Sequence, residues 1–278
     1  MYSTQTPVVR LYDALLAHDG DDACADVLEP WADGHPDEVR WPAAFRERTD
    51  NDWSAATGEA LCRLYALFRV VSLSLLRLQS GRADGSDYPG PKVGVEGLRR
   101  FLERSGFHVP ETVGFHPFFH EVLSVRESGE ATAPVEVLDV RWPCFMLGDL
   151  LFCRAGVSVS AGRSHLVPEI AGSSKLYWTH RRKDRPHEDL SHGWGGRSQW
   201  STPLRRDYRR AGRHHFNVDG RRRLDDPGAD VRGLSAATLI ELVRHRCLVR
   251  TRLDDSDLCP YPYSYVEAVG DRAARARS

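Results

Sequence analysis

The sequence lacks any long apolar run. Its 278 residues contain no apolar stretch of about 18 residues, so we expect no membrane-spanning helix. The first residues also lack the basic start and the apolar segment of a secretory signal peptide, which predicts a cytoplasmic protein. The formal net charge is only −1, so the overall charge predicts no polyanionic partner.

Several familiar motifs are also missing. The six cysteines are scattered, and none forms a CxxC pair or another metal-binding spacing, so we expect buried reduced thiols. No dinucleotide-binding glycine fingerprint, phosphate-binding P-loop, kinase signature or GxSxG nucleophile elbow occurs. The pair His116 and His120 is not the zinc-protease HExxH motif, because its glutamate follows the second histidine.

Helical patterns fill the first part of the chain. Segment 8–17 predicts a short amphipathic helix, segment 55–80 a longer one, and segment 93–106 a third that ends at Gly106. The long segment has the strongest pattern, with apolar residues every three or four positions. These are Leu61, Leu64, Leu67, Phe68, Val71, Leu75 and Leu78.

After about residue 119 the pattern changes to strands. Two strands joined by a turn are predicted over residues 120–142, buried strands follow over 144–162, and Asp219-Gly220 predicts a hairpin turn. A last helix is expected to begin after Ser235 as its N-cap. We therefore expect an α+β fold with a helical N-terminal part, a mostly antiparallel sheet and a closing C-terminal helix.

The expected organisation is one compact domain over residues 1–278. Its helical part covers about 1–118 and its mixed α/β part about 119–278. Two domains divided near residue 126 are the alternative.

Charge is unevenly distributed along the chain. Residues 19–52 hold eleven acidic residues against three arginines, a net charge of −8. Residues 180–223 hold thirteen basic residues, twelve of them arginine, against five acidic ones, a net charge of +8. Arginine with interleaved aromatic residues suits the binding of phosphate or carboxylate groups. The alternative is that the two segments face each other as solvated ion pairs.

Within the basic segment, the loop DLSHGWGGRSQW (189–200) places two tryptophans and a histidine among glycines. We interpret it as the wall of a pocket, with Trp194 and Trp200 as anchors of the loop in the alternative. The predicted catalytic residues are His192, His187 and Asp149. The predicted substrate-binding residues are Arg205, Arg206, Trp194, Trp200 and Gln199. For Asp149, an ordinary turn or cap residue is the alternative.

Histidines also suggest a metal site. The candidate ligands are His187, His192 and His215, with His214 as an alternative to His215, and separately the pair His116 and His120. Histidines four residues apart can share an ion on a helix but are about 13 Å apart on a strand, and this pair precedes a predicted strand. A divalent transition metal is therefore one expectation for the cofactor, and a metal-free site is the other.

Three functions remain open at this stage. The first is an enzyme with a pocket of His, Arg and Trp residues that performs hydrolytic or transfer chemistry on a phosphorylated or carboxylated small molecule, with or without a metal. The second is a nucleic-acid-binding module that uses the 180–223 segment. The third is a protein–protein adaptor whose acidic and basic segments are docking faces.

Overall fold

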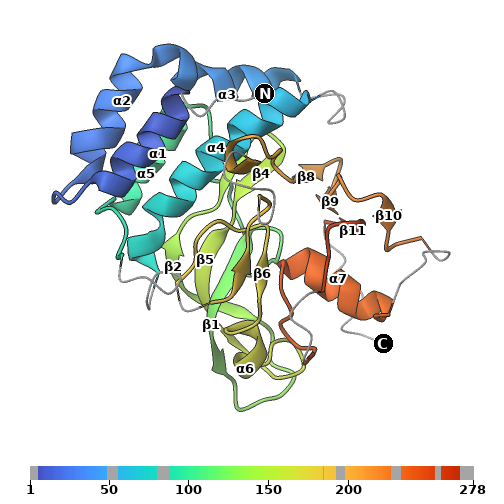
Figure 1. Ribbon diagram of the computed structural model, residues 1–278. Helices are drawn as coiled ribbons and strands as arrows, with labels where there is room; N and C mark the ends of the chain where they lie inside the picture. Colours follow the sequence, from blue (N-terminus) through green and yellow to red (C-terminus); the bar gives the residue numbers. More distant parts are fainter. Residues whose placement is uncertain are drawn as a thin grey trace.

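The computed structural model describes residues 6–48, 56–79, 88–183, 185–191, 198–226, 233–253 and 258–269. The expected α+β class is confirmed, with a helical N-terminal part followed by mixed sheets (Figure 1). Helix α7 comes late in the chain as expected, and strand β11 follows it. Among the described helices, none combines the length and the apolar character needed to cross a bilayer.

The helical part surrounds one buried helix. Its elements are α1 (Pro7–Ala17), a π-helix (Cys24–Leu28), α2 (Glu29–Gly34), α3 (Pro36–Arg48), α4 (Gly58–Ser74), a 3₁₀ turn (Leu76–Leu78) and α5 (Val95–Arg104). The side chains of Thr6 and Thr57 cap α1 and α4 by accepting backbone N–H bonds. From Leu61 to Ser74 every residue of α4 except Arg63 is buried, which explains why its apolar pattern is so strong.

In its described residues, the rest of the chain forms three sheets and a few helices. The largest has the strand order β10-β11-β9-β8-β4-β3, the second has the order β1-β5-β2, and the third pairs β6 with β7. Their strands are β1 (His120–Glu127), β2 (Glu136–Trp142), β3 (Phe145–Leu147), β4 (Leu150–Cys153), β5 (Ala155–Ala161), β6 (Leu176–Tyr177), β7 (His187–Glu188), β8 (Asp207–Arg210), β9 (Arg213–Phe216), β10 (Arg222–Arg223) and β11 (Tyr263–Ala268). The short helices are α6 (Pro168–Ala171), α7 (Ala236–His245) and a 3₁₀ turn (Ser198–Trp200).

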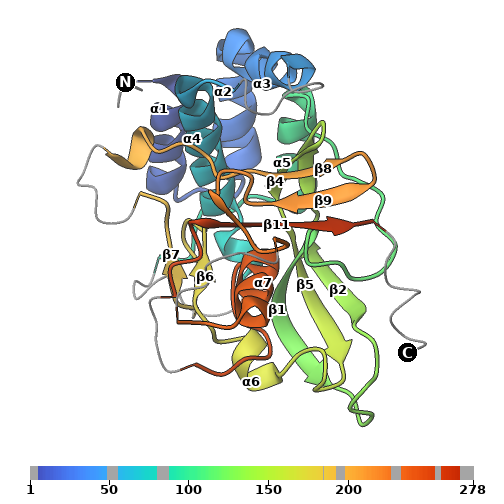
Figure 2. The ribbon, with the colours of Figure 1, turned by 90° about the vertical axis from the view of Figure 1, so that its right-hand side faces the viewer.

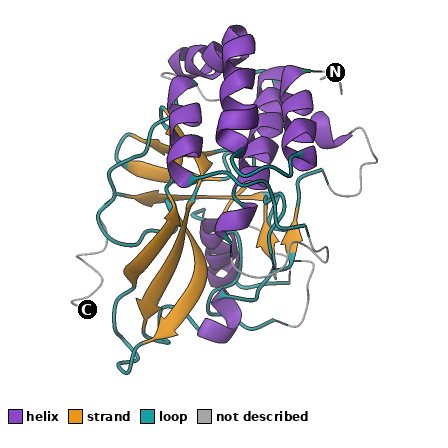
Figure 3. Ribbon diagram, turned by 90° about the vertical axis from the view of Figure 1, so that its left-hand side faces the viewer, coloured by secondary structure: helices purple, strands orange, loops and turns teal. Residues whose placement is uncertain are grey.

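The six-stranded sheet is the middle layer of the molecule. Helices α1 to α5 cover one face, and the sheet β1-β5-β2 with α7 lies beneath the other face (Figures 2 and 3). Alternation along the strands divides the two cores: Leu150 and Tyr208 pack toward the helices, whereas Leu151 and Phe216 pack toward β5 and α7. Side chains on this second face therefore lie between two sheets.

Two expected strand pairings are wrong. Strands β1 and β2 do not pair, because β5 lies between them, parallel to β1 and antiparallel to β2. The turn at Asp219-Gly220 does not close a hairpin either, because β11 enters between β9 and β10. The hairpin in this region joins β8 to β9 at Ala211 and Gly212, which both have positive φ. The strand order here was therefore set by long-range pairing with β11 and not by the local turn dipeptide.

The start of the last helix and the state of the cysteines agree with the expectations. Helix α7 begins directly after Ser235, whose hydroxyl accepts the N–H of Thr238. All six cysteines are free thiols, and five of them are buried.

The described ion pairs of the acidic segment connect it to the helical part, as in Glu38–Arg63 and Asp33–Arg104, and none joins it to residues 180–223. The described ion pairs therefore contradict the suggestion that the acidic and basic segments face each other.

Candidate functional site

Three polar residues form a row across the six-stranded sheet. Arg209 of β8 pairs with His214 of β9, and His214 pairs with Glu267 of β11. Directly opposed residues point to the same face of a sheet, so the three side chains all lie on the face that covers β1 and α7. Sequence positions more than fifty residues apart thus meet in one row.

His116 approaches this row from the turn before β1. Its Nε2 lies 3.2 Å from Oε1 of Glu267, and its ring centroid lies 4.3 Å from that of His214. The Nδ1 atom of His214 lies 4.0 Å from the same Glu267 oxygen, while Arg244 of α7 holds the other oxygen at 2.8 Å. We call His116, His214 and Glu267 the histidine cluster.

His214 is the unusual member of the histidine cluster. It is 2% exposed, its ring stacks on Phe118, and neither ring nitrogen has a hydrogen-bond partner among the described residues. Burial, reinforced by the charge of His116, lowers its pKa to about 4, so it is neutral at pH 7. A buried imidazole without partners is costly, and such groups are frequent where a ligand or a proton is handled.

Glu267 remains ionised. Burial raises its pKa, but His116 and Arg244 outweigh that effect and hold the pKa below its ordinary value. Its Oε1 accepts no hydrogen bond of good geometry from the described residues. The cluster therefore offers one neutral imidazole without a hydrogen-bond partner among the described residues, beside a carboxylate oxygen whose near neighbour is His116.

The three side chains of the histidine cluster are potential metal ligands. In the described part of the chain, this is the one group of three potential ligands whose atoms lie within 4.8 Å of one another. Two imidazoles and a carboxylate suit divalent transition metals. However, Nδ1 of His116 accepts the N–H of Phe118 at 3.1 Å, which places the ring proton on Nε2, toward Glu267. A metal on Nε2 would have to displace that proton and the Phe118 bond, so the tautomer inferred from this hydrogen bond suits proton transfer better.

A cavity of about 310 Å³ lies beside this row, where the β3–β4 turn meets the β8–β9 hairpin. Its lining combines basic groups and one carboxylate with small and apolar residues. These are His108, Pro110, Met146, Gly148, Asp149, Arg209, Arg210, Ala211, Gly212 and Val269. Arg209 connects the cavity to the histidine cluster, because it lines the cavity and is the neighbour of His214 in the sheet. We call this hollow the arginine cavity.

Asp149, a predicted catalytic residue, lies in the arginine cavity. It is an exposed residue of the turn between β3 and β4, and its backbone carbonyl accepts the N–H of Arg209 at 2.9 Å. Asp149 is therefore a turn residue whose carboxylate belongs to a hollow lined by arginine. Its catalytic role stays a prediction.

The structure separates most of the other histidines. His116 meets His214 rather than sharing a site with His120, whose Nδ1 lies 3.0 Å from the backbone N and O of His116. His215 follows His214 on β9, so its side chain is on the opposite face of the sheet. His187 lies on β7, with Nδ1 3.3 Å from the carbonyl of Arg185. His192 and Trp194 lie outside the described residues.

The remaining predicted binding residues serve other contacts. Arg206 is buried and holds Asp219, with its shortest contact at 2.6 Å. The side-chain oxygen of Gln199 accepts a hydrogen bond from Arg69 at 3.2 Å, and Arg205 is half-buried. Trp200 is buried edge-on against Tyr12, which agrees with its alternative interpretation as an anchor of the loop.

A second polar cluster ties this loop to the helices. His180 lies 3.1 Å from the hydroxyl of Tyr12 and 2.9 Å from Asp189, which also accepts hydrogen bonds from Tyr65 and Ser191. Burial lowers the pKa of His180 to about 4, although the hydrogen bond to Asp189 opposes this shift. Because its acceptors and donors satisfy one another, this cluster has the character of a structural connection.

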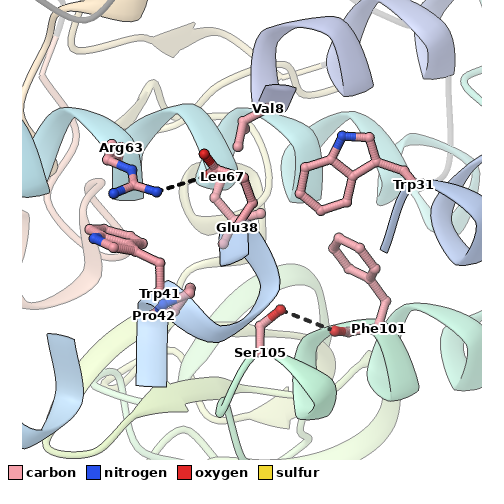
Figure 4. A pocket seen from close by; sticks show the side chains of 9 residues that line it. All are labelled: Val8, Trp31, Glu38, Trp41, Pro42, Arg63, Leu67, Phe101 and Ser105. Carbon is pink, nitrogen blue, oxygen red and sulfur yellow. Dashed lines mark hydrogen bonds and ion pairs between the residues drawn. The ribbon is translucent and has the colours of Figure 1, made fainter. Parts of the chain in front are cut away.

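A smaller hollow lies among the helices, between Trp31, Trp41 and the Glu38–Arg63 ion pair (Figure 4). Its volume of about 10 Å³ accommodates no more than a water molecule, so it does not suit a substrate.

Sequence reasoning missed Glu267, Arg244 and Arg209 as members of the site. Only His214 and His116 belonged to the candidate histidines, and they were assigned to different sites. The alternation along β9 would have placed His214 and His215 on opposite faces, but the pairing of β9 with β11 was needed to find Glu267.

Comparisons of the chain with protein-family models, with curated proteins and with solved structures find no match. The function must therefore be argued from the geometry of the site.

Proposed function

We propose that the protein is an enzyme that binds a small phosphorylated or carboxylated molecule in the arginine cavity and performs hydrolytic or transfer chemistry on it. The observation that carries this proposal is the position of Arg209, which lines the cavity and adjoins the unpartnered His214. A cytoplasmic location is part of the proposal.

Size and charge support the ligand class. A volume of about 310 Å³ is at the lower end of small-molecule sites. Arg209, Arg210 and His108 bring cationic or donor groups to its lining, and Asp149 brings the one carboxylate. Arginine suits the planar geometry of carboxylate and the oxygens of phosphate.

The histidine cluster supports acid–base chemistry. His214 is neutral at pH 7, so one ring nitrogen has a free lone pair that can accept a proton. Glu267 is ionised 4.0 Å away and can stabilise the imidazolium ion that forms. His116 donates toward the same carboxylate and holds it in place. In this proposal His214 is the general base and Glu267 orients it.

Metal assistance is the second version of the same proposal. A divalent transition metal would be held by His116, His214 and Glu267 and would supply Lewis-acid activation of the substrate. Metal analysis of untagged protein separates the two versions: about one equivalent that is lost in His214→Ala favours the metal, whereas metal-free active protein favours the general base.

The other two functions have less support. In the nucleic-acid alternative, Arg182, Arg185 and Arg206 cannot take part because they are buried. That alternative keeps only the exposed arginines of the segment, among them Arg213, Arg221 and Arg223. The adaptor alternative needs a free acidic face, but Asp33 and Glu38 pair with basic residues of the helical part.

Calorimetric titration with two probes, inorganic phosphate and succinate, tests the ligand class. We expect binding of at least one probe, and we expect Arg209→Gln to weaken it at least about tenfold, the effect of losing a charge-assisted hydrogen bond. Arg213→Gln is the matched control, because Arg213 is exposed on the same hairpin and does not line the cavity. Equal losses in both variants, or no binding of either probe, would contradict the proposal.

Turnover of p-nitrophenyl phosphate and p-nitrophenyl acetate tests the chemistry. His214→Gln should abolish turnover while probe binding persists. Retained turnover in that variant would remove His214 from the catalytic role.

A further inference from the structure

A group of buried charges lies between the two larger sheets. It consists of four arginines and two carboxylates, all buried except the half-buried Arg246. Here called the arginine network, they are Glu121, Arg154, Arg182, Arg185, Asp207 and Arg246. Arg154 stands where the chain passes from β4 to β5, and therefore from one sheet to the other. The network thus joins β1, β5, β8 and the end of α7 (Figure 2).

The charges in this network do not balance. Arg154 and Arg246 share one oxygen of Asp207 at 3.1 and 2.9 Å. Arg182 holds Glu121 through two bonds of 2.9 Å. Arg185 forms no ion pair with the described acidic residues and donates to the carbonyls of Ser174 and Val122. Four guanidinium groups against two carboxylates leave two excess positive charges inside the molecule.

Several donors in the network have no acceptor. Nε and Nη1 of Arg154 and Nη2 of Arg185 are buried and make no hydrogen bond with the described residues. Arg154 is 4% exposed and Arg185 is 9% exposed, so bulk water does not satisfy them. Nε1 of Trp178, whose ring lies 5.9 Å from the Arg246 guanidinium, is another unpartnered donor. All of these unpartnered atoms are donors, which is the pattern an anion would satisfy.

The charges of the arginines shift the pKa values of other members of the network. Burial raises the pKa of Glu121, yet Arg182, Arg185 and Arg154 together hold it below its ordinary value. Burial lowers the pKa of Arg154 to about 10, and the charge of Arg246 adds to that effect. Arg154 therefore stays charged at pH 7. An uncompensated buried charge costs several kcal/mol by the usual magnitude, which a bound counter-ion would offset.

We propose that the arginine network binds a small monovalent anion, chloride or an ion of similar size, on Nε and Nη1 of Arg154. The burial of Arg154, Arg182 and Arg185 favours a small ion over a substrate-sized one. A water molecule in the same place would accept some of these hydrogen bonds but would leave both excess charges. The site is structural and separate from the arginine cavity, so its test is independent of the proposed enzyme.

Bromide provides the direct test, because it resembles chloride in size and scatters anomalously. Crystals grown without halide and soaked in sodium bromide should show an anomalous peak at hydrogen-bond distance from Nε or Nη1 of Arg154. The proposal is overturned if bromide occupies surface sites but leaves Arg154 empty.

Unfolding temperature provides the test in solution. Replacing sodium gluconate by sodium chloride at constant ionic strength should raise the Tm by about 2–4 °C when chloride reaches ten times its Kd, and the effect should saturate. Equal Tm values in both salts would overturn the proposal. A bromide peak without stabilisation by chloride would mean an adventitious ion only, which also overturns it.

A pair of variants assigns the effect to the network. Arg154→Met should lose the chloride-specific rise in Tm. Arg163→Met should keep it, because Arg163 is an exposed arginine that pairs with Glu127 and Glu169. If Arg154→Met does not fold, the bromide and chloride measurements on the unmodified protein still decide the question.

Discussion

The helical part and the strand-rich part keep their charges in different places. In the helical part, ion pairs such as Arg104–Asp33 and Arg99–Glu103 lie at the surface, over an apolar core. Charges are buried mainly in the strand-rich part, at Glu121, Arg154, Arg182, Arg185, Arg206, Asp207, His214 and Glu241. Among the described residues of the helical part, Arg69 of α4 is the exception, and it contacts Ser191 and Gln199 from the later part of the chain.

The helical part and the strand-rich part are therefore stabilised in different ways. The helices are stabilised by burial of apolar area, for which surface charges matter little. The strand-rich part accepts the desolvation of many charged groups, which costs free energy unless each group is paired. Both proposed sites lie in the strand-rich part, where charged groups are buried at a cost in desolvation free energy. Such buried charged groups are typical of functional sites. Four predictions test the comparison.

The largest effect is expected from Arg182→Met. This change leaves the Glu121 carboxylate buried without its two bonds, and the free energy of unfolding should fall by roughly 3–5 kcal/mol. Urea denaturation measures it. The double variant with Glu121→Gln should recover part of the loss, because the uncompensated charge is gone. A loss below about 1 kcal/mol would mean that the pair is not a buried one.

In the helical part, Leu64→Ala should cost about 3 kcal/mol, because it removes a fully buried side chain and leaves a cavity. The same urea experiment at low and high salt distinguishes this loss from the previous one. The Leu64 effect should not change with salt, since no charge is involved, and strong salt dependence would contradict an apolar core at this position.

Acidification should destabilise the protein through His214 and His180. Both have a folded pKa of about 4, below the usual value of about 6.5, so the unfolded chain binds more protons between these limits. Their stabilising contribution is complete above pH 6.5 and is lost as the pH falls toward 4. Each histidine accounts for at most about 1.4 kcal/mol per pH unit.

Unfolding curves measured between pH 7 and 4.5 test this slope. His214→Gln should reduce it in part, since His180 and His215, whose pKa is also lowered by burial, remain, whereas the exposed His165→Gln should leave it unchanged. A slope that is the same in His214→Gln as in the unmodified protein would show that His214 titrates normally.

The smallest effect is expected at the surface of the helical part. Arg104→Met breaks the 2.7 Å contact with Asp33, and the free energy of unfolding should change by less than about 1 kcal/mol. Thermal unfolding measures the change. A loss close to that of Arg182→Met would remove the difference between the two regions.

Local patterns were sufficient for much of the fold. The apolar face of segment 55–80 predicted α4, and Ser235 located the start of α7, because capping and helical periodicity depend on neighbours within one or two turns. The same logic failed at Asp219-Gly220, where a good turn dipeptide joins two strands that β11 keeps apart.

The sequence by itself determined the helices, the α+β class, the location of most strands and the set of histidines and arginines worth examining. Only the tertiary structure decided which of them meet. His214 faces Glu267 and His116 because β9 pairs with β11 above the turn before β1, and Asp207 lies between Arg154 and Arg246 because two sheets and a helix end converge there. These contacts join residues far apart in the chain, and strand order is set by the packing of the whole molecule rather than by any local pattern.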